Sequence, residues 1–257
     1  MVGLFAGSFW YRVNQEELLE ARFVKAQQLL QTEHFADAAD QFHRLYQQHP
    51  GFVRASEALF LRADTLNRYL GDYQEALVCY LLLERDYPED SRLTEAYRQV
   101  AGIYKYRLED FSRAIEAYQK VQERETESAD WVQYEIADSY FRLNNFEQAR
   151  IEFASLLKSF PDSTLGPEVQ FRVAVTYALE GQLPEAAGAY QLVAERWPDS
   201  PYAPEAQFGL AGVLEEQEEL QKSLQILEQL EGYQNPDVLQ QKIEKVRARI
   251  GKKKKAI

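Results

Sequence analysis

The sequence predicts an all-α fold, a right-handed α-solenoid of about six helix pairs that ends in a C-terminal capping helix. Three observations predict it. A small residue returns at intervals of 35 to 38 residues, each copy continues with the apolar spacing of a helix, and proline follows most copies. Repeats of this length are typical of solenoids, in which each helix pair packs on its neighbours. The small residues are Ala38, Ala76, Ala114, Ala149, Ala186 and Ser223.

The second helix of each predicted pair is marked by the residues after this small residue. A large side chain lies four positions later, and an aliphatic one lies three positions further on. The spacing i, i+4, i+7 is one face of an α-helix. The large residues are Phe42, Tyr80, Tyr118, Phe153, Tyr190 and Leu227, and the aliphatic ones are Leu45, Leu83, Val121, Leu156, Val193 and Leu230. Since proline cannot continue a helix, these helices are expected to stop before Pro50, Pro88, Pro161 and Pro198.

The first helix of each pair has its own small residue, twelve positions before the other. These residues are Ala26, Gly102, Ala137, Ala174 and Ala211, with Asp64 as the exception. Two small residues that face each other let the paired helices approach closely. Ser163 and Ser200, each after an Asp, offer acceptors near helix starts, and Pro167, Pro184 and Pro204 are expected in first turns.

The predicted organisation has four parts: an apolar N-terminal segment (1–13), six repeats (14–236), a capping helix (237–250) and a basic tail (251–257). Asn14 and Glu17 have the spacing of a capping box, so the first helix is expected to begin near residue 14. Residues 1–13 are too short to span a membrane. They either pack on the first repeat or are the remnant of a membrane anchor, with membrane contact through residues 1–12. The basic tail is either solvated beside a helix dipole or touches anionic lipid.

The six copies resemble the tetratricopeptide repeat over residues 19 to 236. The joins Phe160–Ser163 and Trp197–Ala206 are similar to those of a bacterial envelope subgroup. That subgroup includes the Tol-Pal coordinator and the lipoprotein of the outer-membrane barrel-assembly machine. The resemblance implies a periplasmic or membrane-anchored scaffold that binds proteins and assembles a complex. Two alternatives stay open: a cytoplasmic adaptor or chaperone for secreted subunits, and a structural subunit of a self-assembling complex.

Charge and motifs exclude several other functions. The net charge of −12 disfavours nucleic-acid binding, because such a chain repels phosphate backbones. No phosphate-binding loop, nucleophile elbow or metalloprotease helix is present, so neither catalysis nor a cofactor is expected. His34, His43 and His49 do not have the spacing of three ligands on one helix face, and no metal is expected. Cys79 is the only cysteine and is expected to be a packed thiol.

The resemblance also predicts where a partner binds, because the first helices of such solenoids line a concave groove. Arginine and aromatic residues are enriched at binding hot spots. The predicted groove residues are Arg62, Arg68, Tyr69, Tyr106, Arg107, Trp131, Tyr134, Phe141, Arg142, Phe171 and Arg172. We expect a peptide of acidic or apolar character there, with the alternative that several of these residues pack into the neighbouring repeat. Phe23 and Gln27 stand where the family's chaperone-binding clamp has Lys and Asn, so a chaperone co-factor role is not expected.

Overall fold

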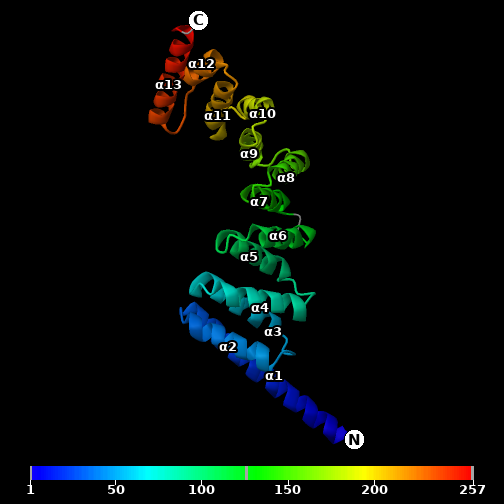
Figure 1. The fold of residues 1–257 in the computed structure, drawn as a ribbon. Coiled ribbons are helices and arrows are strands. Elements are labelled where there is room, and N and C mark those ends of the chain that lie inside the picture. The colour runs from blue at the N-terminus through cyan, green and yellow to red at the C-terminus, as the bar shows by residue number, and fades with distance from the viewer. Residues whose placement is uncertain (1, 125–126, 256–257) are drawn as a thin grey trace. The chain divides into compact units, whose positions relative to one another are not determined.

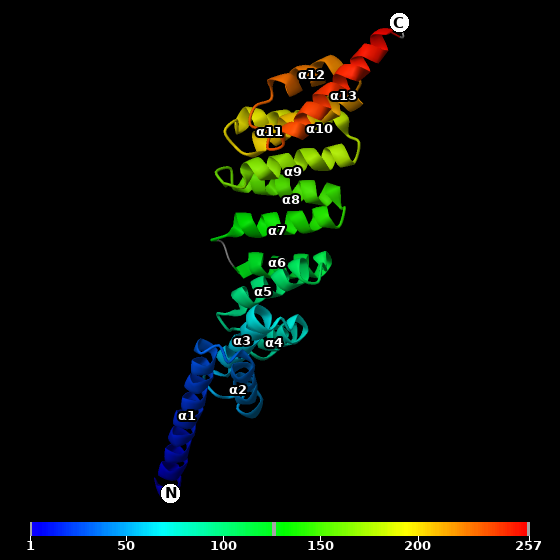
Figure 2. The same ribbon diagram turned by 90° about the vertical axis from the view of Figure 1, so that its left-hand side faces the viewer.

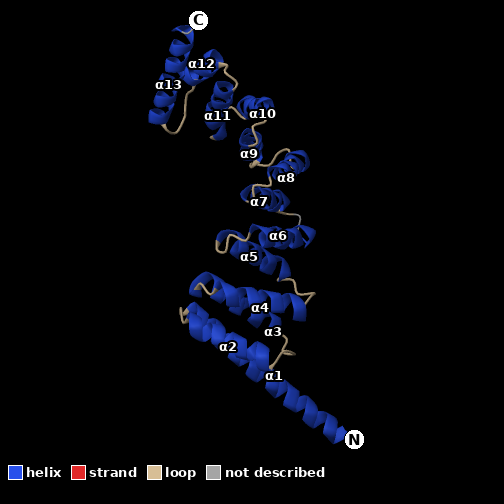
Figure 3. Cartoon of the chain, viewed as in Figure 1, coloured by secondary structure: helices blue, strands red, loops and turns tan. Residues whose placement is uncertain are grey.

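Helices make up all the regular structure that the computed structural model describes, which covers residues 2–124 and 127–255. Side chains are described for residues 15–124 and 127–253. Helices follow one another along the chain, joined by short loops (Figures 1 and 3). The chain forms two compact units, Met1–Glu125 and Thr126–Ile257, which are described separately below.

Unit 1 contains three consecutive helix pairs. The pairs are α1 with α2, α3 with α4, and α5 with α6 (Figure 2). A short π-helix, η1, continues α3 directly. The bounds are α1 Val2–Gln31, α2 Phe35–Gln48, α3 Ala55–Thr65, η1 Leu66–Leu70, α4 Tyr73–Asp86, α5 Leu93–Tyr106 and α6 Phe111–Arg124.

Unit 2 contains three further pairs and a terminal helix. The pairs are α7 with α8, α9 with α10, and α11 with α12, and α13 packs on α12. The bounds are α7 Ala129–Arg142, α8 Phe146–Ser159, α9 Gly166–Leu179, α10 Leu183–Arg196, α11 Tyr202–Glu216, α12 Leu220–Gln229 and α13 Pro236–Lys255. Ile243 and Val246 of α13 are buried against α11 and α12, as expected for a helix that caps a repeat array.

The repeat pattern correctly predicted the core. All six small residues of the second helices are buried, and so are the twelve large and aliphatic residues, none more than 7% exposed. Ser223, in the place of alanine, donates a hydrogen bond from its Oγ to the carbonyl oxygen of Ala211 at 2.7 Å. This bond satisfies a hydroxyl that is fully buried, which explains why a polar residue is tolerated there.

Local signals account for most helix ends. Four second helices end two residues before Pro50, Pro88, Pro161 or Pro198, as predicted. The tight turn inside each pair has one residue with positive φ. These residues are Glu33, Gly71, Glu109, Asn144, Gly181 and Glu218. Ser163 Oγ accepts a hydrogen bond from the Leu165 amide, whereas the Ser200 hydroxyl, predicted to act similarly, has no partner in the described part of the chain.

The predicted start of the first helix near residue 14 is wrong. Helix α1 runs without a break from Val2 to Gln31, because no proline interrupts it and extending an existing helix is easier than starting one. The capping helix also differs from the predicted 237–250. It extends to Lys255, so the described part of the basic tail is helical, as lysine readily allows. Met1 and residues 256–257 lie outside the described residues.

No helix among the described residues combines the length and the apolar character needed to cross a membrane. The membrane-anchor hypothesis for residues 1–13 therefore stays a prediction.

Candidate protein-binding site

The predicted groove residues divide between the two units. Unit 1 holds Arg62, Arg68, Tyr69, Tyr106 and Arg107, and unit 2 holds Trp131, Tyr134, Phe141, Arg142, Phe171 and Arg172. Each set lies on, or directly after, the first helices of its pairs. The two sets have different surroundings, which distinguish residues available to a ligand from residues that hold the fold together.

Three of the predicted residues meet at one cavity of unit 1, which we call the first-helix cleft. Its volume is about 630 Å³. It lies where η1 ends, α4 begins and α5 ends. The lining residues are Asn67, Arg68, Tyr69, Leu70, Gly71, Tyr73, Gln99 and Arg107.

The π-helix η1 and the turn after it shape one wall of this cleft. Short π-helical turns occur frequently at functional sites. The turn itself needs Gly71, whose φ of 68° strains residues with a side chain. Tyr69 is 53% exposed, and its ring stacks on Phe35 of α2 with centroids 4.2 Å apart. This stacking leaves a fixed aromatic surface beside the cleft.

Polar side chains from α3, η1 and α5 form a connected row that begins in the cleft and extends beyond its lining to Asp64 and Glu95. Asn67 Nδ2 donates to Gln99 Oε1 at 2.9 Å, and Gln99 Nε2 donates to Glu95 Oε1 at 2.6 Å. Arg68 donates from Nε to Asp64 Oδ1 at 2.5 Å, although burial raises the pKa of Asp64. The Arg68 side chain is 51% exposed, and ion pairs at such positions are weak. Arg68 can therefore exchange its partner for a ligand carboxylate at low cost.

Arg107 is the second cation that lines the cleft. It is exposed, its guanidinium lies 5.4 Å from the ring centroid of Tyr73, and no carboxylate pairs with it among the described residues. The neighbouring Tyr106 is also exposed. An exposed arginine flanked by aromatic rings has the composition of a protein-binding hot spot.

Arg62 does not reach the cleft. Its side chain is only 12% exposed and turns toward α4, where Nη2 lies 2.7 Å from Glu75 Oε1. Nη1 donates to the sulfur of Cys79 at 3.2 Å. Burial raises the pKa of this thiol to about 11, which agrees with the packed cysteine predicted from the sequence.

In unit 2, the predicted residues Tyr134 and Arg172 form an internal network between α7 and α9. Tyr134 donates from its hydroxyl to Glu168 Oε1 at 2.5 Å and accepts from Arg172 Nη2 at 3.1 Å. Arg172 also pairs with Asp138 at 2.9 Å. Burial and the bond to Glu168 raise the pKa of Tyr134. These groups satisfy one another, so they stabilise the packing of neighbouring repeats rather than await a ligand.

The other predicted groove residues of unit 2 differ in how far they are buried. The Phe171 ring packs against Tyr190 and Tyr202 at 5.8 and 5.7 Å, and the Phe141 ring packs against Phe146 at 5.5 Å. Trp131 is half-buried. Arg142 is exposed and lies 3.8 Å from Asp138. The alternative reading of the sequence, in which several groove residues pack into the neighbouring repeat, therefore describes much of this set.

Sequence reasoning missed the polar partners in both places. Asn67 and Gln99 lie 32 residues apart, and Tyr134 and Glu168 lie 34 apart. A separation close to one repeat length was the available signal, because it places two residues side by side on neighbouring first helices. Among the described residues, no group of three or more His, Cys, Asp or Glu side chains could hold a metal ion.

The consecutive helix pairs define a class of protein, the helical-repeat solenoid. The chain belongs to the tetratricopeptide repeat family, whose sequence model matches residues 23–92, 100–164 and 134–201. Members of this family generally mediate protein–protein interactions and complex assembly and are non-catalytic. Comparison with the curated proteins found no match.

Solved structures of other repeat proteins share the fold. YrrB, described as a TPR protein with an unusual peptide-binding site, is 18% identical with a TM-score of 0.55, over 80% of this chain and 99% of its own. A tetratricopeptide repeat protein from Parabacteroides merdae is 17% identical with a TM-score of 0.56, over 90% and 87%. The Naa15/Naa10 structure bound to HypK-THB is 16% identical with a TM-score of 0.56, over 93% of this chain and 35% of the matched one. At these identities the likeness extends to the fold alone.

Proposed function

We propose that this protein is a non-catalytic scaffold that binds a segment of a partner protein in the first-helix cleft of unit 1. The observation that carries the proposal is the exposed guanidinium of Arg107, which no carboxylate of the described residues pairs, beside a polar cavity that Tyr69 borders. Arginine supplies fork-like hydrogen bonds to carboxylates, and the tyrosines supply rigid contact area. A peptide with an acidic residue next to an apolar one fits this combination.

The row of side-chain amides adds a second means of recognition. Asn67 donates to Gln99, which in turn donates to Glu95, and the remaining polar atoms of the two amides suit the backbone of an extended peptide. YrrB, a protein of the same fold, is described by its peptide-binding site. For this chain, peptide binding is part of the proposal.

For the cellular role, we propose assembly of a multiprotein complex of the bacterial cell envelope, with the protein periplasmic or membrane-anchored. The sequence of the joins between repeats supports this role. Cell fractionation tests it, since recovery of the protein wholly in the cytosol would favour the adaptor or chaperone alternative. Measurement of its mass in solution tests the third role, because a self-assembling subunit forms a stable oligomer without other proteins.

The binding site is tested by Arg107→Glu combined with Tyr106→Ala, both exposed positions. Arg44→Glu is the matched control, because Arg44 is also exposed and, within the part of the chain that the structure describes, pairs with Asp40 of its own helix alone. Partners are captured by cross-linking in the source cells, and their affinities are then measured with purified components. Hot-spot residues contribute at least about 2 kcal/mol, so we expect the double variant to weaken binding roughly 30-fold or more. Unchanged affinity in the double variant would exclude the first-helix cleft.

A further inference from the structure

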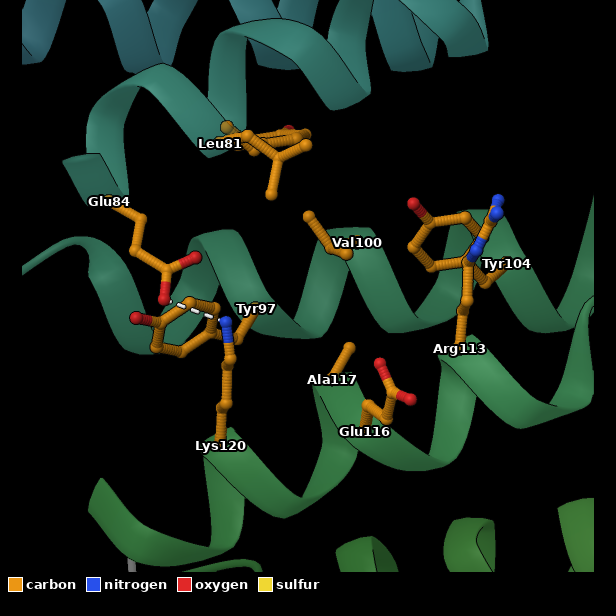
Figure 4. A pocket seen from close by; sticks show the side chains of 10 residues that line it. Leu81, Glu84, Tyr97, Val100, Tyr104, Arg113, Glu116, Ala117 and Lys120 are labelled. Atoms are coloured by element: carbon orange, nitrogen blue, oxygen red, sulfur yellow. Dashed lines mark hydrogen bonds and ion pairs between the residues drawn. The ribbon is translucent and has the colours of Figure 1, made fainter.

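A second cavity of unit 1 is lined mostly by the second helices α4 and α6, and we call it the second-helix cleft. It has a volume of about 220 Å³ and is formed by α4, α5 and α6. Figure 4 shows side chains from all three helices directed toward one space. The lining residues are Tyr80, Leu81, Glu84, Tyr97, Val100, Tyr104, Arg113, Glu116, Ala117 and Lys120.

The centre of this cleft is apolar. Val100 and Ala117 are buried, and Leu81 points toward Val100 across the space (Figure 4). Leu81 is 49% exposed, and Val78, one turn earlier on α4, is 47% exposed. The volume lies below the roughly 300–1,000 Å³ of small-molecule sites, so the cleft has the size for a side-chain anchor. Two exposed apolar residues one turn apart extend this surface along α4.

The cations at the cleft are already neutralised. Lys120 Nζ lies 2.7 Å from Glu84 Oε1 and 5.1 Å from the ring centroid of Tyr97. Arg113 lies 3.5 Å from Asp110, with its guanidinium 5.5 Å from the ring of Tyr104. Each positive charge is thus matched by one carboxylate and faces an aromatic ring.

Glu116 is the remaining charged residue that lines the cleft. Its side chain lies between those of Arg113 and Lys120 (Figure 4), it is exposed, and it has no ion pair or hydrogen bond within the described residues. The three carboxylates Glu84, Asp110 and Glu116 thus exceed the two cations Arg113 and Lys120 by one negative charge, and this excess, on a chain of net charge −12, favours a cationic partner.

We propose that the second-helix cleft docks an amphipathic helix of another protein that presents one bulky apolar side chain and, one turn away, a lysine or arginine. The apolar side chain enters the space between Leu81 and Val100, and the cation pairs with Glu116. The cleft and the exposed apolar residues Val78 and Leu81 along α4 suit a helix, because helices place residues three or four apart on one face. This surface is separate from the first-helix cleft, so the proposal goes beyond the proposed function and stands without it.

The test uses two synthetic helical peptides that are identical except at one position. Each carries a central phenylalanine, followed four residues later by lysine in one peptide and by glutamate in its twin. Both are titrated into the full chain at low salt, and the methyl signals of Val100 and Leu81 are followed by NMR. We expect the lysine peptide to bind about threefold to fivefold more tightly, because a partly exposed ion pair contributes up to about 1 kcal/mol.

Variants separate this site from others. Glu116→Lys should reverse the order of the two peptides, and Leu81→Glu should weaken the lysine peptide at least about tenfold. Ile151→Glu is the matched control, because Ile151 is 54% exposed on α8, and it should leave both affinities unchanged. Arg107→Glu should also leave them unchanged, which separates this proposal from the first-helix cleft. Equal affinity for the twins, an unchanged order in Glu116→Lys, or no shift of Val100 up to millimolar peptide would overturn the proposal.

Discussion

Replacing Tyr134 by phenylalanine should destabilise unit 2 without disturbing any ligand in unit 1. The ring stays in place, so the packing against Phe153 is retained. The change removes one hydrogen bond given to Glu168 and one accepted from Arg172. The prediction follows from the conclusion that Tyr134 connects α7 to α9, although its position on a first helix suggested a binding residue.

The expected magnitude follows from the exposure of the groups. Hydrogen bonds to charged groups are worth roughly 1.5–3 kcal/mol when buried. Glu168 and Arg172 are about one-fifth to one-quarter exposed, and Glu168 keeps Arg172 as a partner. The lower end, about 1.5 kcal/mol, is therefore expected. For a chain of this size that loss lowers Tm by about 3–6 °C.

Amide hydrogen exchange is the decisive assay, because repeat arrays open locally. Exchange in α7 and α9 should become about tenfold faster, and exchange in α3 and α5 should not change. Tyr140→Phe is the control: it makes the same chemical change on the same helix, but its hydroxyl forms no hydrogen bond among the described residues. Equal exchange rates in Tyr134→Phe and Tyr140→Phe would refute the structural role of the network.

Three further predictions concern other parts of the chain. Glu109→Gly should raise the free energy of unfolding by about 0.5–1 kcal/mol in urea titrations, because the φ of 52° at this position strains glutamate but not glycine. An unchanged urea midpoint would count against strain at this turn. Cys79 should resist thiol reagents at pH 8, since burial raises its pKa to about 11, and its labelling rate should follow unfolding; rapid labelling of the folded chain would contradict its burial. Burial opposes ionisation of Glu215, but Lys242 and Arg249 outweigh it and lower its pKa below the usual 4.5. The ionised Glu215 therefore contributes its full stabilisation above pH 4.5, and this contribution is lost as the pH falls further. Circular dichroism should show α13 loosening in acid. Glu215→Gln should remove that pH dependence.

The core could be predicted because it depends on spacing alone. Residues such as Ala114, Tyr118 and Val121 occupy one helix face, and a face shared by six copies must be buried. The helix ends before prolines such as Pro161 could be predicted equally well, since proline restricts the backbone only within a few residues. The start of α1 could not be predicted, because the capping signal at Asn14 competes with helix extension, and local sequence does not decide that competition.

For the candidate site, sequence reasoning identified Arg68, Tyr69 and Arg107 but could not distinguish them from Arg62 and Arg172. All five are polar or aromatic residues on or beside first helices. Which of them stays available depends on acids elsewhere in the chain: Glu75 lies against Arg62, and Asp138 and Glu168 lie against Arg172. No carboxylate among the described residues does the same for Arg107.

The sequence by itself therefore determined the repeat, its core and the family, because these follow from the periodicity of apolar residues along a helix. Only the tertiary structure decided which charged side chains are paired across neighbouring helices and which remain exposed. Burial repeats with a fixed spacing, whereas each ion pair depends on the rotamers and positions of two side chains about 13 to 34 residues apart.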